Sequence, residues 1–223
     1  FWDCGEFIAS SYKLEVGHPP GNPVFQLFAK FFTLFADAQH AAAMVNVSSA
    51  ICSALTILLL YLTLVWFIKR IIRPQSDGTY STIAALGIMA SAMVGSLCYC
   101  FSDTFWFSAV EGEVYAMSSL FTALVFWLMT LWYDKADEPH SLKWIVLIAF
   151  LMGLSIGIHL LNLLAIPALV FMYFYRYKDQ YDTKDYLKIF LIGVGILALI
   201  LFIIIPWLPK LAAYFDLFFV NIL

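Results

Sequence analysis

The chain is dominated by long apolar segments that carry almost no charge. Four of them run over about residues 45–68, 81–100, 114–132 and 187–208, and a longer one runs over 143–175. A helix needs about 20 apolar residues to cross the ~30 Å hydrocarbon core of a bilayer. The segments lack the alternating pattern of membrane strands, so they predict helices rather than a barrel. We therefore expect an all-α polytopic membrane protein.

Composition excludes the soluble classes of protein. Hydrophobic residues make up 63% of the 223 residues and charged residues 12%, against ~45–50% and ~25% in soluble domains. Such a chain cannot cover itself with polar surface. A net charge of −3 with only 12 Lys and Arg residues also argues against binding to nucleic acid. The lipid bilayer is the partner that composition predicts.

The distribution of basic residues predicts the orientation of the spans. The 69–73 loop contains three Lys or Arg residues, the 101–114 loop none, and the 176–188 loop four. Basic loops stay on the cytoplasmic side, so we expect 69–73 and 176–188 inside and 101–114 outside. Residues 1–44 then lie outside as a first outer loop, and 45–223 form the helical bundle. Because the chain begins with Phe1 and ends in an apolar run, we expect it to be a fragment of a longer protein, with a helix before Phe1.

The segment from Lys143 to Tyr175 is too long for one span and short for two. An even number of crossings must separate the cytoplasmic 133–143 region from the 176–188 loop. We therefore predict a hairpin of two short helices with its turn near 155–159, where Gly153 and Gly157 weaken the helix. His159 is expected at the outer tip. The alternative is one long tilted helix, which would place the basic 176–188 loop outside.

An amphipathic helix is predicted within the first 44 residues. Phenylalanines recur at helical spacing between Pro23 and Phe35. The stretch carries a single Lys, so we place it flat at the membrane interface.

Polar groups that are far apart in sequence converge on the predicted outer face: Asp3, Glu6, His18, Glu111, Glu113 and His159. Asp3 and Glu6 are three residues apart, which places them on one side of a helix. A carboxylate at a membrane surface can act as a general base, although a helix cap beside a solvated Glu explains the same spacing. His18 sits in the Pro- and Gly-rich loop 17–23, which could hold it as a donor to an anion or be purely structural.

Two further polar pairs admit both a functional and a structural interpretation. Glu111 and Glu113 precede a span, where one acid suits the helix dipole and the other could face the bundle. His159 and Asn162 are about one turn apart among leucines, where an interhelical hydrogen bond is the structural alternative to catalysis.

Read in order, these motifs resemble a known family. Phe1-Trp-Asp-Cys-Gly-Glu-Phe-Ile8, Val16-Gly-His-Pro-Pro-Gly-Asn-Pro23, Glu113-Val-Tyr115 and Gly157-Ile-His159 are similar to a family of multispanning proteins long catalogued as a domain of unknown function. Its animal members include protein O-mannosyltransferases of the GT-C type. The resemblance covers almost the whole chain, which would be an N-terminal part of a longer member with a GT-C-like helical bundle.

The resemblance implies an inverting glycosyltransferase that acts on the non-cytoplasmic face. It would move a sugar, expected to be mannose, from a polyprenyl-phosphate donor to a Ser or Thr hydroxyl of a protein acceptor. Asp3 would be the base, with Glu6 as rival or helper, and His18 and His159 would stabilise the phosphate. The acceptor or sugar would be oriented by Glu111, Glu113, Tyr115 and Asn162. The Pro23–Phe35 helix would guide the lipid tail.

No metal or other cofactor is expected with a monophosphate donor, although the paired acids could hold a divalent cation. Two other classes stay open at this point: a transporter or channel subunit, which would use broken helices near mid-membrane, and a non-catalytic membrane subunit, which would not need an Asp/His cluster.

Overall fold

The computed structural model describes residues 3–178 and 180–222, and it contains helices but no strand in that part of the chain. The chain forms two compact units, Phe1–Asn162 and Leu163–Leu223. Four helical stretches of the described residues are long and apolar enough to cross a membrane: Ala38–Ile71, Thr82–Cys100, Val114–Lys135 and Thr183–Ile222. The predicted all-α polytopic membrane protein is therefore confirmed.

The first unit is built around helix α3 (Ala41–Ile71), which packs against α4 (Thr82–Cys100) and α6 (Val114–Lys135). Helix α7 (Leu142–Ile156) packs on the other side of α6. The buried face of α3 consists largely of small residues, among them Ser48, Ser49, Cys52, Ser53 and Thr56. Small side chains let helix backbones approach closely where no hydrophobic effect drives association.

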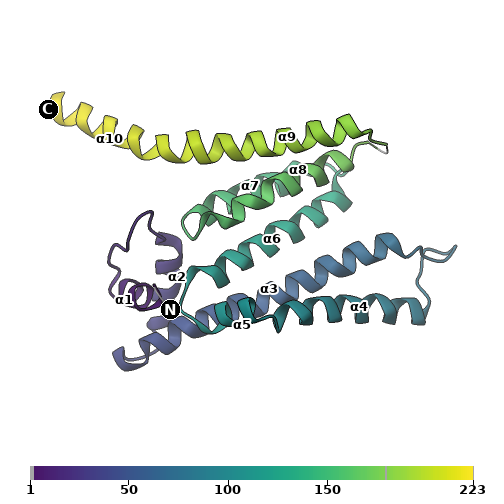
Figure 1. Cartoon of the computed structure of the whole chain (residues 1–223), viewed down its shortest axis with the longest axis horizontal. Helices are drawn as coiled ribbons and strands as arrows, with labels where there is room; N and C mark the ends of the chain where they lie inside the picture. Colours follow the sequence, from purple (N-terminus) through teal and green to yellow (C-terminus); the bar gives the residue numbers. More distant parts are fainter. Residues whose placement is uncertain (1–2, 179, 223) are drawn as a thin grey trace. The chain divides into compact units, whose positions relative to one another are not determined.

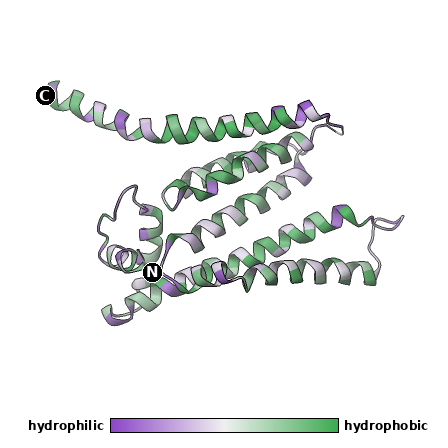
Figure 2. Ribbon diagram, in the orientation of Figure 1, coloured by the Kyte–Doolittle hydropathy of each residue, from purple (hydrophilic) through white to green (hydrophobic). Residues whose placement is uncertain are grey.

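Three short helices gather at one end of this bundle (Figure 1): α1 (Cys4–Lys13), α2 (Pro23–Thr33) and α5 (Asp103–Val110). Helix α2 buries Phe25, Ala29 and Thr33, which recur every four residues, and it packs against α1 and α3. The predicted amphipathic helix is therefore present, and it ends at Thr33 rather than Phe35. Hydrophilic residues are concentrated in this α1–α2 region and near helix ends (Figure 2). Helices α1 and α2 therefore place polar groups against the ends of α3 and α6.

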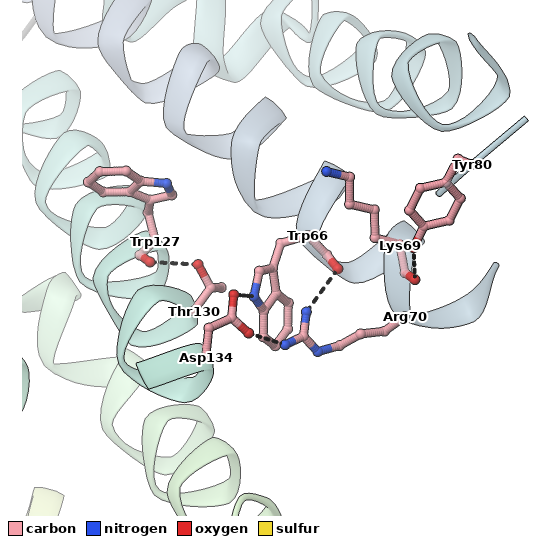
Figure 3. A network of polar contacts seen from close by, with 7 residues as sticks. All are labelled: Trp66, Lys69, Arg70, Tyr80, Trp127, Thr130 and Asp134. Carbon is pink, nitrogen blue, oxygen red and sulfur yellow. Dashed lines mark hydrogen bonds and ion pairs between the residues drawn. The ribbon is translucent and has the colours of Figure 1, made fainter. Parts of the chain in front are cut away.

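The opposite end of α3 is joined to α6 by a group of polar and aromatic side chains (Figure 3). The Arg70 guanidinium lies 3.3 Å from the centre of the Trp66 ring and forms an ion pair with Asp134. The Trp66 indole N–H donates to the same carboxylate at 2.9 Å. Because the C-terminal ends of α3 and α6 meet here, the two helices run in the same direction. The basic residues after Trp66 therefore lie at the far end from α1 and α2.

The 101–114 stretch is not the loop that we predicted, because α5 occupies most of it. Ser102 precedes the helix and Asp103 occupies its first turn, where a carboxylate favours the helix dipole. Phe105 is the buried residue of α5, and its ring centre lies 4.5 Å from that of Tyr99. This aromatic stretch therefore forms a helix of eight residues with one ring buried.

The predicted break in the 143–175 segment is present. Helix α7 ends at Ile156, Gly157 is its C-cap, and the chain continues through the 3₁₀ helix Leu160–Ala165 before α8 (Ile166–Tyr175). A single continuous helix, the alternative considered from the sequence, is therefore excluded.

The second unit contains α8, α9 (Thr183–Leu199) and α10 (Ile205–Ile222), and α8 packs against α9 where Gly193 faces Pro167. We expected the last span to end at about residue 208, but the helical path continues to Ile222. A π-helical turn at Ile200–Ile204 directly precedes Pro206, and such local adjustments let membrane helices tolerate proline.

Candidate active site

Helix α1 places two carboxylates beside the histidine loop. Asp3 is the N-cap residue of α1, and its carbonyl accepts the Phe7 N–H at 2.9 Å, so Glu6 follows one turn later on the same side. One ligand atom from each of Asp3, Glu6 and His18 lies within 4.8 Å of the other two. The convergence that we predicted for these three residues is therefore present in the structure, with all three exposed.

Glu6 is bound to His18 by three contacts. Its Oε1 accepts the His18 backbone N–H at 2.7 Å, and both carboxylate oxygens lie 3.1 Å from His18 Nδ1. Hydrogen bonds from the backbone and the ring of His18 lower the pKa of Glu6. A carboxylate only accepts, so Nδ1 carries the shared proton and Nε2 is the ring nitrogen left for a ligand.

The loop that carries His18 is fixed by its own turn. The Gly21 N–H donates to the His18 carbonyl at 2.9 Å, and Gly21 has a φ of +83°, a value that favours glycine. The His18 ring stacks on Phe7 with 5.8 Å between ring centres. The imidazole is therefore held on one side by an aromatic ring and on the other by a carboxylate.

His159 approaches the same region from the end of α7. Its Nδ1 accepts the Leu161 backbone N–H at 3.1 Å. A backbone N–H can only donate, so His159 is the neutral tautomer with its proton on Nε2. Burial lowers its pKa, which favours this neutral form. The ring centre lies 5.3 Å from that of Tyr115.

A backbone contact holds the His159 turn against α2. The Val24 N–H donates to the Gly157 carbonyl at 2.9 Å. Helix α2 begins directly after the His18 loop, so this hydrogen bond fixes the distance between the two histidine-bearing segments. A Cβ on Gly157 would lie 2.6 Å from Val24 Cγ2, which shows how close the approach is.

Two cavities meet at Asp3. The first, of about 300 Å³, is lined by both histidines together with Asp3, Glu113 and Tyr115. The second, of about 930 Å³, is lined by Asp3, Asp103, Glu111, Glu113, Tyr115 and several aromatic residues. Asp3, Glu113 and Tyr115 border both cavities. Asp3 therefore lies between a histidine-lined space and an acidic one.

Glu111 and Glu113 directly precede α6, as the sequence predicted, with Glu113 as the N-cap of that helix. They cap the two ends of the bend between α5 and α6, where Glu113 N–H donates to the Glu111 carbonyl at 2.9 Å. Both are 8% exposed. Gly112 allows this because a Cβ there would lie 2.9 Å from Val45 Cγ1. Both acids are consequently drawn into the fold instead of pointing to different sides.

The burial of Glu113 predicts a pH-dependent stability. Desolvation, with smaller contributions from the charges of Glu111 and Asp3, raises the pKa of Glu113 above its ordinary 4.5. Because the pKa of Glu113 is higher in the folded than in the unfolded protein, its contribution to folding stability is fully present below pH 4.5. That contribution is lost as the pH rises through the folded-state pKa. We expect Glu113→Gln to raise the melting temperature by a few degrees at neutral pH. The difference should vanish below pH 4.5; a constant difference at all pH values would contradict it.

Asn162 is separated from the other candidate residues. It is fully buried, and its Nδ2 donates to Ser155 Oγ at 2.9 Å. The 3₁₀ geometry after His159 turns it away from the helical face that the two residues were expected to share. It takes the structural role that the sequence left open, tying the 3₁₀ segment to α7. Sequence reasoning in turn missed Asp103, which borders the acidic cavity from the first turn of α5.

The Asp3, Glu6 and His18 side chains could also hold a divalent cation, since oxygen and imidazole donors suit several metals. The same trio suits a base beside a histidine whose orientation a second carboxylate fixes. The donors alone are compatible with both arrangements.

The known proteins that are similar to this chain all point to one family. A family model described as the protein O-mannosyl-transferase TMEM260 N-terminal domain matches residues 3–183. The "Protein O-mannosyl-transferase tmem260" of Dictyostelium discoideum is 23% identical over 93% of this chain and 25% of its own length. The mouse protein of the same name is 27% identical over 69% of this chain and 19% of its own length. The chain thus spans a quarter or less of these relatives, and no solved structure matches it.

Proposed function

Since this chain belongs to the family of TMEM260-type protein O-mannosyl-transferase N-terminal domains, we propose that it carries the reaction centre of a GT-C-type mannosyltransferase. The donor is a polyprenyl-phosphate mannose and the acceptor is a Ser or Thr hydroxyl of a protein. One observation supports the assignment of the site above all: Asp3 borders both a histidine-lined and an acidic cavity. A base between donor and acceptor is what a single displacement requires.

In the proposed reaction, the acceptor hydroxyl attacks the anomeric carbon of the donor sugar. Asp3 takes the hydroxyl proton as the new C–O bond forms. The bond between the anomeric carbon and the phosphate oxygen breaks, and the electron pair leaves with the polyprenyl phosphate. One displacement inverts the configuration at the anomeric carbon. The mechanism needs one base and a site that stabilises the departing phosphate.

The histidine-lined cavity supplies the phosphate site in this proposal. His159 offers a neutral Nε2–H donor, because its Nδ1 is occupied by the Leu161 N–H. As an imidazolium, His18 would offer Nε2–H as a second donor while Nδ1–H stays on the Glu6 carboxylate. Two preorganised donors stabilise charge that develops on the leaving group. Glu6 acts here as a positioning residue for His18 rather than as a second base.

The acidic cavity is the proposed acceptor side. Its volume of about 930 Å³ is three times that of the histidine-lined cavity, at about 300 Å³, so it can admit a segment of polypeptide. Glu113 and Tyr115 border both cavities and are suited to orient the sugar or the acceptor, with Glu111 beside them.

We place this reaction on the non-cytoplasmic face of the membrane. The support is the charge distribution along α3: the candidate site lies near its first turns, and Lys69 and Arg70 end it. Basic helix ends favour the cytoplasmic side. The site at the other end of the parallel helices α3 and α6 would then face the lumen or periplasm.

A transfer assay tests the proposal directly. The full-length protein in liposomes should transfer labelled mannose from a polyprenyl monophosphate donor to a protein acceptor, with inversion and without loss of rate in EDTA. A structure with the bound donor should show its phosphate on His18 or His159. Absence of transfer, or a phosphate bound at the Arg70 end, would contradict the proposal.

A further inference from the structure

The histidine-lined cavity is bordered by one buried polar side chain that the proposed reaction does not use. Asn22 lies beside His18 and Gly21 in the cavity wall. It is only 5% exposed, and neither its amide oxygen nor its amide nitrogen has a hydrogen-bond partner among the described residues. A buried amide without partners lowers the stability of a protein, and native structures rarely contain one without a reason. The cavity wall thus holds a donor and an acceptor that the fold itself does not use.

Helix capping does not account for Asn22. It is the N-cap residue of α2, where an asparagine normally accepts a backbone N–H of the first turn, but its side chain makes no such hydrogen bond. Pro23 has no N–H to donate, and the Val24 N–H donates to the Gly157 carbonyl at 2.9 Å. The amide oxygen lies near Gly17 instead, 4.0 Å from the position that a Cβ on that glycine would occupy. The structural role that the N-cap position predicts for this side chain is therefore not observed.

The chemistry of an amide indicates the kind of ligand that it can bind. The side chain of asparagine carries an oxygen that accepts and an NH₂ group that donates. An ionised phosphate oxygen only accepts, so a phosphate would satisfy the nitrogen and leave the oxygen unpaired. Two neighbouring hydroxyl groups satisfy both, because a hydroxyl can donate as well as accept. We propose that Asn22 binds a pair of adjacent hydroxyl groups on the sugar of the donor and so contributes to the selection of that sugar.

The position of Asn22 in the cavity suits this role, which rests on the proposed function because it assumes a sugar donor. The cavity of about 300 Å³ lies at the lower end of the ~300–1,000 Å³ range of small-molecule sites. His18 and His159 are assigned to the phosphate and Asp3 to the reacting centre, which leaves the wall around Asn22 for the hydroxyls of the ring. Both amide atoms are enclosed, so the side chain has to turn about its Cα–Cβ bond for a ligand to reach it. A sugar with the matching hydroxyls would then replace an unpaired amide by two hydrogen bonds.

The stability of a variant separates this role from a structural one. Replacing an unpaired buried amide by an apolar side chain of similar size is neutral or stabilising. In the full-length protein without donor, Asn22→Leu should therefore not lower the melting temperature. Asn162→Leu is the matched control and should lower it, because the Asn162 Nδ2 donates to Ser155 Oγ at 2.9 Å. A lower melting temperature for Asn22→Leu would indicate a structural role and overturn the inference.

Sugar selectivity provides the functional measurement. Wild-type protein should transfer mannose with a kcat/KM about tenfold or more above that for donors lacking one hydroxyl at either of two adjacent ring positions. Asn22→Leu should lower kcat/KM for the mannosyl donor by a similar factor and abolish the discrimination at those two positions. Asn162→Leu should keep the discrimination. Transfer by Asn22→Leu with the discrimination of the wild type would overturn the inference and leave the proposed function intact.

A complex of the wild-type protein with its donor tests the inference without any variant. Its structure should show the Asn22 amide within hydrogen-bond distance of two sugar hydroxyls. An amide that is still enclosed and unpaired, or that binds the phosphate, would overturn the inference. Polyprenyl-phosphate mannose should also raise the melting temperature more than polyprenyl phosphate does, and Asn22→Leu should remove that difference. If both results are obtained but no mannose is transferred, the proposed function fails while the sugar site stands.

Discussion

Replacing Asp3 with Asn should lower the rate of mannosyl transfer by about 10²–10⁴, the usual cost of losing a general base. The substituted amide keeps the size of the side chain and can still begin α1, since the N-cap position of this helix makes no side-chain hydrogen bond. The variant should therefore fold normally and still bind donor. Initial rates with labelled lipid donor, measured beside the melting temperature, check both parts of this expectation.

Two further variants serve as comparisons for Asp3→Asn. Glu15→Gln removes an exposed carboxylate of the following loop, which pairs only loosely with Lys13 at 3.7 Å, and should retain full activity. Glu6→Gln keeps an oxygen for the His18 backbone N–H but loses the charge beside Nδ1. It should change the pH profile of transfer more than its maximal rate. Near-normal turnover of Asp3→Asn with an inactive Glu6→Gln would move the base to Glu6.

Replacing Gly157 with Ala should destabilise the protein by about 1–3 kcal/mol, the range for overpacking in a closely packed contact. The φ of Gly157 is −75°, which alanine adopts freely. The cost arises because the added Cβ would lie 2.6 Å from Val24 Cγ2. Relieving that contact must lengthen the Val24–Gly157 hydrogen bond and move the His159 turn away from the His18 loop. Activity should therefore fall even at temperatures where the variant is folded.

Gly153→Ala is the matched control, one helical turn earlier on α7. A Cβ there meets no atom within 4 Å, and alanine within a helix usually gains about 0.4–1 kcal/mol over glycine. Thermal unfolding of the two variants should therefore shift in opposite directions. Val24→Ala should partly restore Gly157→Ala, because it removes the methyl groups that collide. Equal shifts in both glycine variants would show that the contact carries no such constraint.

Much of the fold follows from the hydropathy of the chain. Apolar runs place α3, α4 and α6 within a few residues of their observed bounds, and the phenylalanine spacing after Pro23 predicts α2. Gly157 marks the break in the 143–175 segment. The sequence misplaced α5 and the end of the last helix. In α5 a single buried phenylalanine stabilises the helix, and before Pro206 a π-turn accommodates the proline. Neither is visible as a local pattern.

For the candidate site, too, some features could be predicted from the sequence and others depend on the tertiary structure. Residue types, loop rigidity and the family resemblance identified Asp3, Glu6, His18 and His159 from the sequence. That Glu6 binds His18, that Leu161 fixes the tautomer of His159, and that Glu111 and Glu113 both turn inward were decided by tertiary structure. On a regular helix, Asn162 and His159 would lie on the same face, but the 3₁₀ segment after His159 places them apart.

The sequence by itself therefore determined that this chain crosses a membrane as helices, and which polar groups stand near helix ends, because both depend on the composition of contiguous stretches. Only the tertiary structure decided that Asp3 borders two cavities. The residues that line them come from α1, α6 and the segment after α7, which are more than a hundred residues apart in the sequence. The contacts that create them, such as Gly157 on Val24 and Gly112 on Val45, exist only when the helices pack.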